Sequence, residues 1–342
     1  MTIHVGLIGG GNISDTHARA ALAIPEVKIS AIFGSNAEKV RALAQKYGGK
    51  PFGSLEEFLD HRPMDLVAIG SPSGLHAKHG IAAASRGLQV LTEKPIDIST
   101  AAADELINAA EQHNVKLGVM FQDRLKPEIR KLKLWMERGV LGQPLLADAR
   151  VKWYRPPEYY ANSKWRGTLD LDGGGALINQ AVHTVDLLLW LMGDVVKVQS
   201  NAATVFHDIE GEDLVLSTLE FETGALGSLQ ASTAAYPGYP RRLEITGSEG
   251  TIILEHDRIV AVDLRSAPDD VRPGVPSADS ENVSSPVVSD FSGHQAIFED
   301  FISAIKNDRA PACDGHEARR SIALLERIYA AAGRKPRGVR AG

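Results

Sequence analysis

The most constraining feature of the chain is a regular alternation of β-rich runs and segments of helical length over residues 1–122. The runs are "HVGLIGG", "VKISAIFG", "DLVAIGS", "QVLTEK" and "KLGVMFQ". Between them, Ser54 and Glu57 have the spacing of a capping box, and Ser99 is placed as the N-cap of a helix. Strands separated by helices pair in parallel through right-handed crossovers, so we predict an α/β region with a parallel sheet.

The pattern changes after Gln122. One helical stretch, "PEIRKLKLWMERG", comes first, and it is followed by β-rich runs, most of which have no helix between them. The later runs are "LLADARVKWYR", "VKVQSNAATVF", "DLVLSTLEF", "ALGSLQASTA", "RRLEITG" and "GTIILE". A stretch rich in Ser, Pro, Asp and Val at 266–292 is typical of a long exposed loop, and helices are expected near 294–307 and 315–332. We therefore predict an α+β region with a large, mostly antiparallel sheet.

The length of the chain agrees with a division at this change of pattern. A chain of 342 residues holds two domains at roughly 150 residues each. We place the first domain at 1–122 and the second at 123–342.

Charge and cysteine content exclude several classes of partner. The formal net charge is −6 and the basic residues are scattered, so we expect no binding to nucleic acid or to anionic lipid. No apolar stretch approaches the roughly 18 residues that a membrane span needs. Cys313 is the single cysteine, so an internal disulfide or a zinc site built on several cysteines is excluded. No basic segment precedes the first β-rich run, and we expect a cytoplasmic protein.

The segment "GLIGGGNIS" carries a glycine pattern between the first strand and the first helix. Gly9, Gly11 and Ser14 have G-x-G-x-x-G spacing, with Ser in place of the third glycine. Glycines there allow a tight turn and a close approach of the backbone to a pyrophosphate at a helix N-terminus. A plain turn is the alternative, but the position in the first βα unit favours a dinucleotide site. Asn12 and Ile13, inside the motif, are expected to contact the cofactor too.

The end of the second strand bears on the choice between NAD and NADP. The sequence there is "FGSNAEKV", with no acidic residue at 34–36 to bind the ribose hydroxyls. Ser35, Asn36 and Lys39 could instead donate to a 2′-phosphate, which slightly favours NADP. The alternative is that Asn36 is only a helix N-cap and Lys39 a solvated charge.

Glu93 and Lys94 stand at the C-terminal end of a strand, in the segment "LTEKP". Ligands of open parallel sheets bind at that end, and Pro95 keeps Lys94 in an extended backbone. We expect both residues near the cofactor, although a surface lysine before a turn is the alternative.

The segment "GGGALINQAVHTVD" places several polar groups on a helix. At about 100° per residue, Asn179, His183, Asp186 and Trp190 share one stripe. His183 and Asp186 alone make a poor metal site, and we predict no metal. One alternative is a buried histidine whose ring Asp186 holds. The other is that His183 exchanges the proton of a substrate hydroxyl while Lys94 polarises the same oxygen.

Taken together, six segments resemble the family of glucose-fructose oxidoreductase, inositol dehydrogenase and rhizopine catabolism proteins (Gfo/Idh/MocA). They are "GGGNIS", "GSPSGLHA", "EKP", "FQDRLKP", "GGGALINQAVHTVDLLLWLMG" and "RRLEITGSEGTI", in this order along nearly the whole chain. The resemblance implies an N-terminal Rossmann domain and a C-terminal α+β domain. In this family the open sheet of the second domain often forms the interface of a homodimer or homotetramer. The implied substrates are sugars, cyclitols or related alcohols.

The family motifs also assign residues in this sequence. Lys94 and His183 match the catalytic pair. Ser71, Pro72 and His76 match a segment on the nicotinamide side of the cofactor, and Gln122 is expected near it.

One position departs from many dehydrogenating members of the family. They carry Asp four residues before the histidine, whereas this chain has Asn179, which can hydrogen-bond a hydroxyl but cannot accept its proton. The segment "NQAVHTVD" resembles a branch that includes sugar and nucleotide-sugar 3-dehydrogenases.

Substrate contacts are expected from "KWYRPPEYYANSKWRG" and from Arg124 after the sixth strand. Within that segment, the aromatic faces and cationic forks of Tyr154, Trp165 and Arg166 suit a polyhydroxylated ring, as do Asn179 and His183 on the helix. A loop that packs on a neighbouring subunit is the alternative.

From these features we predict an NAD(P)-dependent oxidoreductase that interconverts a secondary alcohol of a sugar or sugar derivative with its ketone. The alternatives are a ketosugar or dicarbonyl reductase and a non-catalytic sensor that binds the dinucleotide on the same fold.

Overall fold

A computed structural model describes residues 2–266, 268, 270–272 and 290–334 of the chain. Its contacts separate two compact units, one formed by 1–122 with 286–319 and the other by 123–285 with 320–342. The contacts divide the chain after Gln122, and they group 286–319 with the first unit. The domain limits 1–122 and 123–342 stay a prediction. Most of the predicted loop at 266–292 lies outside the described residues.

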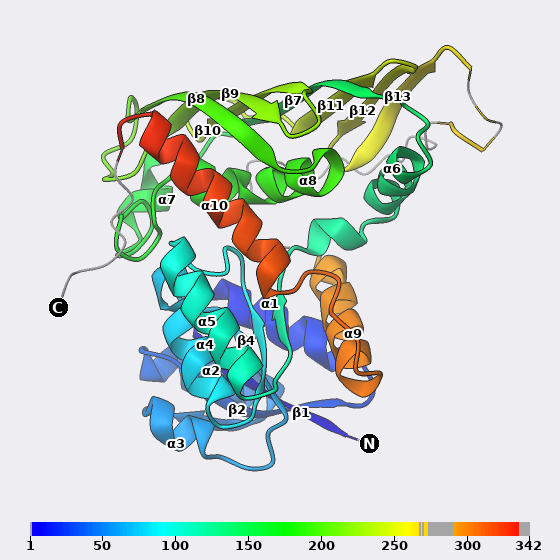
Figure 1. Cartoon of the computed structure of the whole chain (residues 1–342). Helices are drawn as coiled ribbons and strands as arrows, with labels where there is room; N and C mark the ends of the chain where they lie inside the picture. The colour runs from blue at the N-terminus through cyan, green and yellow to red at the C-terminus, as the bar shows by residue number, and fades with distance from the viewer. Residues whose placement is uncertain (1, 267, 269, 273–289, 335–342) are drawn as a thin grey trace. The chain divides into compact units, whose positions relative to one another are not determined.

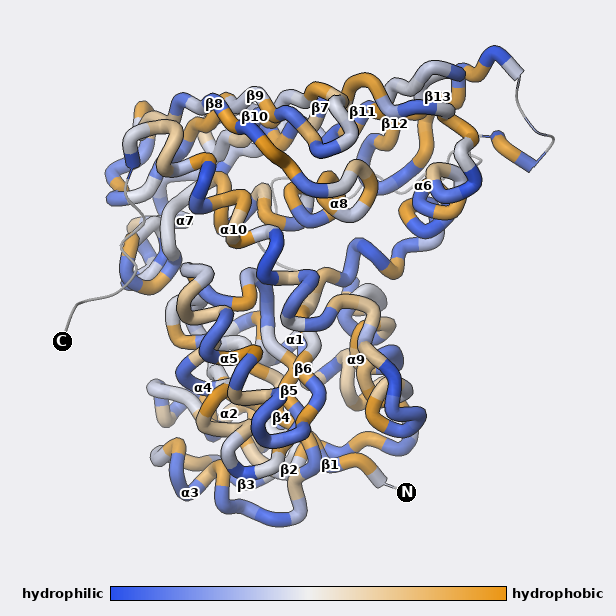
Figure 2. The backbone as a smooth tube through the Cα atoms, viewed as in Figure 1, coloured by the Kyte–Doolittle hydropathy of each residue, from blue (hydrophilic) through white to orange (hydrophobic). Residues whose placement is uncertain are grey.

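The first unit is built on a six-stranded parallel sheet of order β3-β2-β1-β4-β5-β6 (Figure 1). Its strands are β1 (Ile3–Ile8), β2 (Val27–Phe33), β3 (Lys50–Phe52), β4 (Leu66–Ile69), β5 (Gln89–Thr92) and β6 (Leu117–Val119). All residues of β4, inside the sheet, and of β6, at its edge, are buried, and the tube colouring marks both strands as apolar (Figure 2). Sheets buried on both faces require such continuous apolar runs. The five predicted strands are present, and only the three-residue β3 is additional.

Helices flank this sheet, and two of them begin after the predicted N-caps Ser54 and Ser99. They are α1 (Asn12–Leu22), α2 (Ala37–Tyr47), α3 (Leu55–Leu59), α4 (His76–Ala84), α5 (Thr100–Gln112) and α9 (Ser292–Lys306), with the 3-10 turn η1 (Ser73–Leu75). Ser54 Oγ accepts a hydrogen bond from the Glu57 N–H, and Ser99 Oγ accepts one from the Ala102 N–H. Both predicted N-caps are thereby confirmed.

The assignment of α9 to the first unit has a local cause. This helix packs on α1, and the segment after it pairs with β6 through a bridge between Gly118 and Asp314. Its apolar face, with Phe298 and Phe301 buried, therefore covers part of the first sheet rather than the second.

The second unit contains a seven-stranded sheet of order β13-β12-β11-β7-β10-β9-β8. The strands are β7 (Pro144–Lys152), β8 (Val195–Ala203), β9 (Leu214–Phe221), β10 (Leu226–Ser232), β11 (Arg242–Gly247), β12 (Gly250–Glu255) and β13 (Arg258–Leu264). Neighbouring strands are antiparallel except for β7 and β10, which confirms a mostly antiparallel sheet. Residues of β9 alternate between buried and exposed, as expected when one face of a sheet is covered.

The helices of the second unit lie on one face of this sheet (Figure 1). They are α6 (Pro127–Glu137), α7 (Pro157–Ala161), α8 (Val182–Met192) and, from Arg320 onward, α10 (Gly315–Ala331), with the 3-10 turn η2 (Gln122–Leu125) and a π-helical turn η3 (Ala176–Ala181). The predicted stripe assumes α-helical periodicity through Asn179. The structure corrects this, because Asn179 lies in the wider turn η3 and α8 begins only at Val182.

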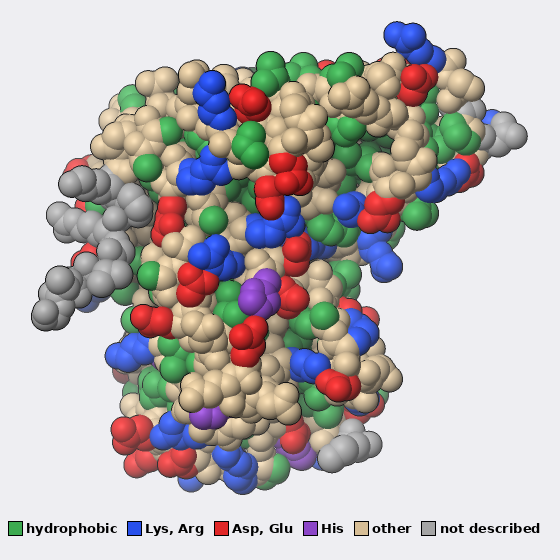
Figure 3. Space-filling view, in the orientation of Figure 1, with side chains coloured by type: hydrophobic (Ala, Val, Ile, Leu, Met, Phe, Trp, Pro, Cys, Tyr) green, Lys and Arg blue, Asp and Glu red, His purple; other side chains and the backbone are tan. Residues whose placement is uncertain are grey.

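Within the described residues, no helix combines the length and apolarity that a membrane crossing would need. On the face shown in Figure 3, acidic and basic side chains are interspersed. A location in the cytoplasm stays a prediction.

Candidate functional site

The turn between β1 and α1 forms a cradle at the switch point of the first sheet. The Gly9 N–H donates to Phe33 on one side, while the Gly70 N–H donates to Ile8 on the other. Gly9 has φ of 135°, and a Cβ there would lie 2.7 Å from the backbone oxygen of Gly70. This position therefore requires glycine.

Gly11 differs from Gly9, because a Cβ on it would meet nothing within 4 Å. It is the N-cap of α1, and the helix N-terminus with its unpaired N–H groups opens onto this space. Ser14 is buried one turn later at the position of the third glycine of the motif. An open space before a helix N-terminus fits the pyrophosphate of a dinucleotide.

The exposed residues after β2 lie beside this cradle. Ser35, Asn36 and Lys39 are exposed, and a Cβ on Gly10 would lie 3.5 Å from Lys39 Cβ. Asn36 Oδ1 accepts a hydrogen bond from the Lys39 N–H at 3.0 Å, so Asn36 is the N-cap of α2. Its amide nitrogen and the Lys39 ammonium remain compatible with an anionic ligand.

His76 braces the turn after β4. Its Nδ1 lies 2.8 Å from the Pro95 oxygen and its Nε2 2.9 Å from the Ser71 oxygen, and the side chain is buried. Ser71 Oγ also lies 2.9 Å from Nδ1 of His79. Burial lowers the pKa of His79 to about 4, so this imidazole is neutral at pH 7. The predicted contact of Ser71, Pro72 and His76 with the cofactor stays a prediction, whereas the bracing of Lys94-Pro95 by His76 is observed.

Glu93 joins three parts of the first unit. Its Oε1 lies 2.9 Å from His17 Nε2 on α1 and 3.1 Å from His294 Nε2 on α9, and its Oε2 accepts from the Lys94 N–H. Burial alone would raise the pKa of Glu93, but the hydrogen bonds and charges of the two histidines outweigh it and hold that pKa well below its usual range. Glu93 thus fixes the backbone from which Lys94 projects.

Among the described residues, His17, Glu93 and His294 also form a group that could hold a metal ion. The distances from both imidazoles to Oε1 are those of hydrogen bonds. Buried His17 Nδ1 has, within the described part of the chain, no hydrogen-bond partner of the kind that orients a metal-bound histidine. Hydrogen bonding accounts for this cluster.

Gln122 ends the first unit, in the turn η2. Its Oε1 is buried with no hydrogen-bond partner among the described residues, and Gly293 of α9 packs against its side chain. An orphaned acceptor fits an amide donor such as the carboxamide of a nicotinamide.

His183 lies in the first turn of α8, in the second unit. Its Nδ1 is buried and lies 3.5 Å from Asp123 Oδ2, while 12% of its side-chain surface is exposed. Asp123 also pairs with Arg241 Nη1 at 2.6 Å and with Lys126 Nζ at 2.9 Å. Burial would raise the pKa of Asp123, but Arg241, His183 and Lys126 hold it well below its usual range. Sequence reasoning missed Asp123, although its acidic side chain follows a buried strand.

Asp186 and Arg124 form a separate buried ion pair. Arg124 donates to both carboxylate oxygens at 2.8 and 2.7 Å, and its guanidinium lies over the Trp190 ring. Arg124 is 3% exposed and braces α8 through this pair, and its predicted contact with a substrate stays a prediction. Likewise, the carboxylate that faces His183 Nδ1 belongs to Asp123, not to Asp186 as the alternative from the sequence supposed.

Asn179 is held by its neighbours through both ends of its amide. Its Nδ2 donates to Asp172 Oδ1 at 2.5 Å, and its Oδ1 accepts from Gln180 at 2.6 Å. Gln180 accepts in turn from Arg155 and donates to the Tyr159 hydroxyl. The carboxylate expected four residues before the histidine is thus replaced by an amide that contacts the buried carboxylate of Asp172.

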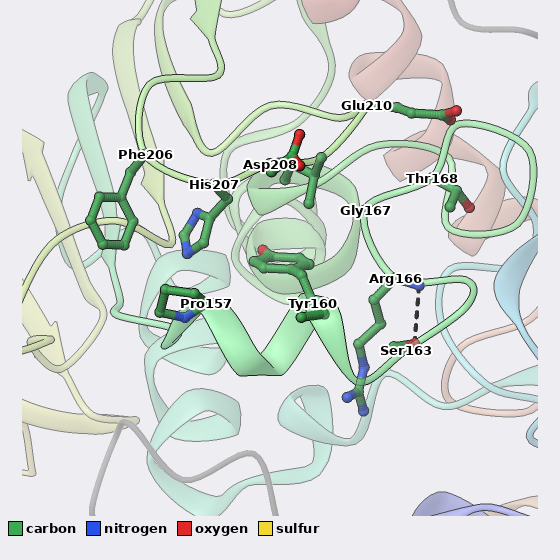
Figure 4. Close-up of a pocket in the computed structure, with 12 residues that line it drawn as sticks. Pro157, Tyr160, Ser163, Arg166, Gly167, Thr168, Phe206, His207, Asp208 and Glu210 are labelled. Atoms are coloured by element: carbon green, nitrogen blue, oxygen red, sulfur yellow. Dashed lines mark hydrogen bonds between the residues drawn. The ribbon is translucent and has the colours of Figure 1, made fainter.

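The aromatic segment after β7 lines a pocket of the second unit. This pocket has a volume of about 670 Å³ and lies between α7 and the loop at 206–210 (Figure 4). Of the predicted site residues, Arg166 lines it, with its guanidinium 4.2 Å from the centre of the Tyr159 ring. Trp165 is half-buried beside Arg166, and the Tyr154 ring contacts Tyr236 edge-on.

Comparison with known proteins matches both units. Residues 3–121 match the model described as "Oxidoreductase family, NAD-binding Rossmann fold", and residues 129–253 match the "GFO/IDH/MocA C-terminal domain". The curated myo-inositol 2-dehydrogenase of Thermotoga maritima is 28% identical over 270 residues, which cover 77% of this chain and 78% of the relative. An uncharacterized oxidoreductase, YrbE of Bacillus subtilis, is 29% identical over 78% of this chain and 77% of its own length.

Solved structures agree over almost the full length. The WlbA dehydrogenase of Bordetella pertussis, in complex with NADH and UDP-GlcNAcA, is 30% identical with a TM-score of 0.88. The alignment covers 97% of this chain and 96% of that one. A levoglucosan dehydrogenase, in complex with NADH and levoglucosan, shares the fold at 22% identity with a TM-score of 0.84 over 97% of both chains.

Proposed function

Since the chain belongs to the Gfo/Idh/MocA family of oxidoreductases, we propose that it interconverts a secondary alcohol of a glycoside or nucleotide sugar with the corresponding ketone. It is an oxidoreductase with an NAD-binding Rossmann domain acting on a sugar hydroxyl. One observation supports this choice of substrate class. The chain matches, over 97% of its length, a dehydrogenase in complex with a nucleotide sugar.

In the proposed chemistry, two side chains act on the same substrate hydroxyl. A bound oxidised dinucleotide supplies the acceptor for the hydride of the carbinol carbon. His183 takes the hydroxyl proton, and Lys94 holds and polarises the same oxygen. Asn179 contributes a fixed amide rather than a proton acceptor. Tyr154, Trp165 and Arg166 are proposed as contacts to the sugar or to an anionic group on it.

A substrate screen tests the proposal. Monosaccharides, glycosides, inositols and nucleotide sugars are assayed with NAD and NADP, and the matching ketones with the reduced cofactors. We expect turnover with a sugar derivative, and a loss of at least about 10²-fold in Lys94→Ala and in His183→Ala. Unchanged turnover in His183→Ala would mean that His183 has only a structural role. Reduction of ketosugars alone would favour a reductase, and tight cofactor binding without turnover would favour a sensor.

For the cofactor, we propose a slight preference for NADP. The support is the absence of an acidic residue at 34–36 and the exposure of Ser35 and Lys39 beside the glycine cradle. We expect NADPH to bind at least as tightly as NADH, and Ser35→Asp to reverse the order. A clearly higher affinity for NADH in the unaltered protein would refute the preference.

We also propose that the open face of the second sheet joins subunits into a homodimer or homotetramer. Leu146 and Leu226 are paired in register on β7 and β10, and both are exposed, as is Leu216 on β9. Exposed apolar groups on one sheet face are typical of an interface. Sedimentation should show an oligomer that Leu226→Lys dissociates, whereas a monomeric unaltered protein would refute the proposal.

A further inference from the structure

One ring nitrogen of His183, Nδ1, faces a buried carboxylate. Nδ1 is buried and faces the Asp123 carboxylate at 3.5 Å, so the 12% of the side chain that is exposed belongs to other atoms of the residue. A histidine that exchanges a proton with a ligand needs one nitrogen open and the other held. The buried nitrogen is therefore the one whose partner fixes the tautomer.

Asp123 is itself held in place by two cationic side chains, Arg241 and Lys126. Arg241 precedes β11 and pairs with Asp123 and Asp257, while Lys126 precedes α6 and pairs with the same two carboxylates. Asp257 lies in the turn between β12 and β13. Two carboxylates and two cations thus balance, and the His183 imidazole lies against one of these carboxylates.

Such a cluster is costly to bury unless every charge is paired. Asp123, Arg241 and Asp257 are each no more than 19% exposed at the side chain. A hydrophobic contact would fill the same volume beside α8 at lower cost. The cluster does something that an apolar core would not, because it places a fixed negative charge at Nδ1 of His183.

We propose that Asp123 is the positioning residue of His183, holding the ring proton on Nδ1 so that Nε2 is left to accept the proton of the substrate hydroxyl. This inference rests on the proposed function of His183. When Nε2 takes the proton, the imidazolium carries its charge toward Asp123, and the 3.5 Å contact shortens to a charge-assisted hydrogen bond. No proton moves to Asp123, which stays ionised beside Arg241 and Lys126.

The tautomer of His183 is measured directly on the unaltered protein. Nitrogen-15 NMR of histidine-labelled protein, assigned with His183→Ala, distinguishes Nδ1–H from Nε2–H in the neutral ring. We expect Nδ1–H, and a neutral ring with its proton on Nε2 would overturn the proposal even if no variant of Asp123 folds.

Two matched variants test the same point through pH profiles. Asp123→Asn should lower the pKa of His183, and with it the acidic limb of kcat/KM, by about 1 pH unit, because a neighbouring anion stabilises the imidazolium. It should also lower kcat about tenfold or more. Asp257→Asn removes a carboxylate from the same cluster but leaves Asp123 against the imidazole. We expect Asp257→Asn to keep the His183 tautomer. Its shift of the acidic limb of kcat/KM should be less than half of the shift caused by Asp123→Asn.

A double-mutant cycle separates positioning from general damage. In the His183→Ala background, Asp123→Asn should cause no further loss of turnover. An equal loss in both backgrounds, with the His183 tautomer unchanged, would overturn the proposal and leave Asp123 a structural residue. Full turnover in His183→Ala alone would instead overturn the proposed function, whatever the tautomer.

Discussion

Removing one partner of the ion pair between Arg124 and Asp186 should be among the most destabilising single changes in the second unit. Asp186→Asn keeps the volume of the side chain but removes its charge, so the Arg124 guanidinium, at 3% exposure, loses the carboxylate with which it pairs. In the native pair, the guanidinium donates two hydrogen bonds of 2.8 and 2.7 Å to the Asp186 carboxylate. Breaking a buried pair from one side costs about 3–5 kcal/mol.

The expected loss is measurable through intrinsic fluorescence. All four tryptophans, at positions 135, 153, 165 and 190, belong to the second unit, and Trp190 lies 5.4 Å from the Arg124 guanidinium. Urea denaturation followed by tryptophan emission therefore reports on this unit. We expect the midpoint to fall by the equivalent of about 3–5 kcal/mol, or roughly 6–20 °C in a thermal scan.

Two control variants test whether the loss comes from a buried charge that has lost its partner. Replacing both partners, Arg124→Met with Asp186→Leu, should recover most of the loss, because no buried charge is then left unpaired. Asp194→Asn breaks a more exposed pair with Arg320 and should cost no more than about 1 kcal/mol. A loss below about 1 kcal/mol in Asp186→Asn, or a double variant no more stable than it, would refute the reasoning.

Three further predictions concern the two units separately. Gly9→Ala should lower the free energy of unfolding by about 1–3 kcal/mol because of its φ and its backbone clash, whereas Gly11→Ala should fold normally in calorimetry and weaken dinucleotide binding about tenfold or more. Stability and binding that change together in both variants would contradict this. Asn179→Asp should place two carboxylates in contact at Asp172 and destabilise the second unit at pH 7 by about 1–3 kcal/mol, with recovery toward pH 5 or on adding Asp172→Asn. Equal stability at pH 5 and pH 7 would count against that account. The pKa of His79 is lowered from 6.5 to about 4, so its contribution to stability is complete above pH 6.5 and is lost as the pH falls toward 4. Calorimetry between pH 4 and 7 should show this loss, and His79→Gln should reduce it; an unchanged slope would be inconsistent with a histidine origin.

The elements with strong periodic signals could be predicted from the sequence. Local patterns predict five of the six parallel strands and the caps at Ser54 and Ser99. They also predict the two last helices, α9 and α10. The three-residue β3 carries too little pattern to be distinguished from the loops beside it, whereas β13, with its run of Ile and Val, was missed although its sequence is typical of a strand. Local sequence also could not show which unit α9 joins, because an amphipathic helix does not specify the surface that it covers.

Local sequence patterns also could not predict the role of several single residues in the site. Spacing on an ideal helix predicts a stripe through Asn179, but the π-helical turn η3 changes its register relative to His183. Asp123 could not be singled out, because its importance comes from Arg241 and Asp257, which are more than 100 residues away in sequence. Arg124 is placed correctly after the last parallel strand, yet its role depends on a carboxylate contributed by α8.

The buried contact between Glu93 and His294 joins residues 201 positions apart, and this separation has a consequence for synthesis of the protein. When the ribosome has completed residues 1–122, the parallel sheet has all its strands, but the face of α1 that α9 covers is still open. Glu93 and His17 then lack their third partner, and the apolar surface that Phe298 and Phe301 bury is in contact with water. The nascent first unit therefore has to remain incompletely packed while the whole second sheet is synthesised. A fragment that ends at Gln122 would reproduce this state permanently, and it should bind hydrophobic dyes and chaperones that the full chain does not.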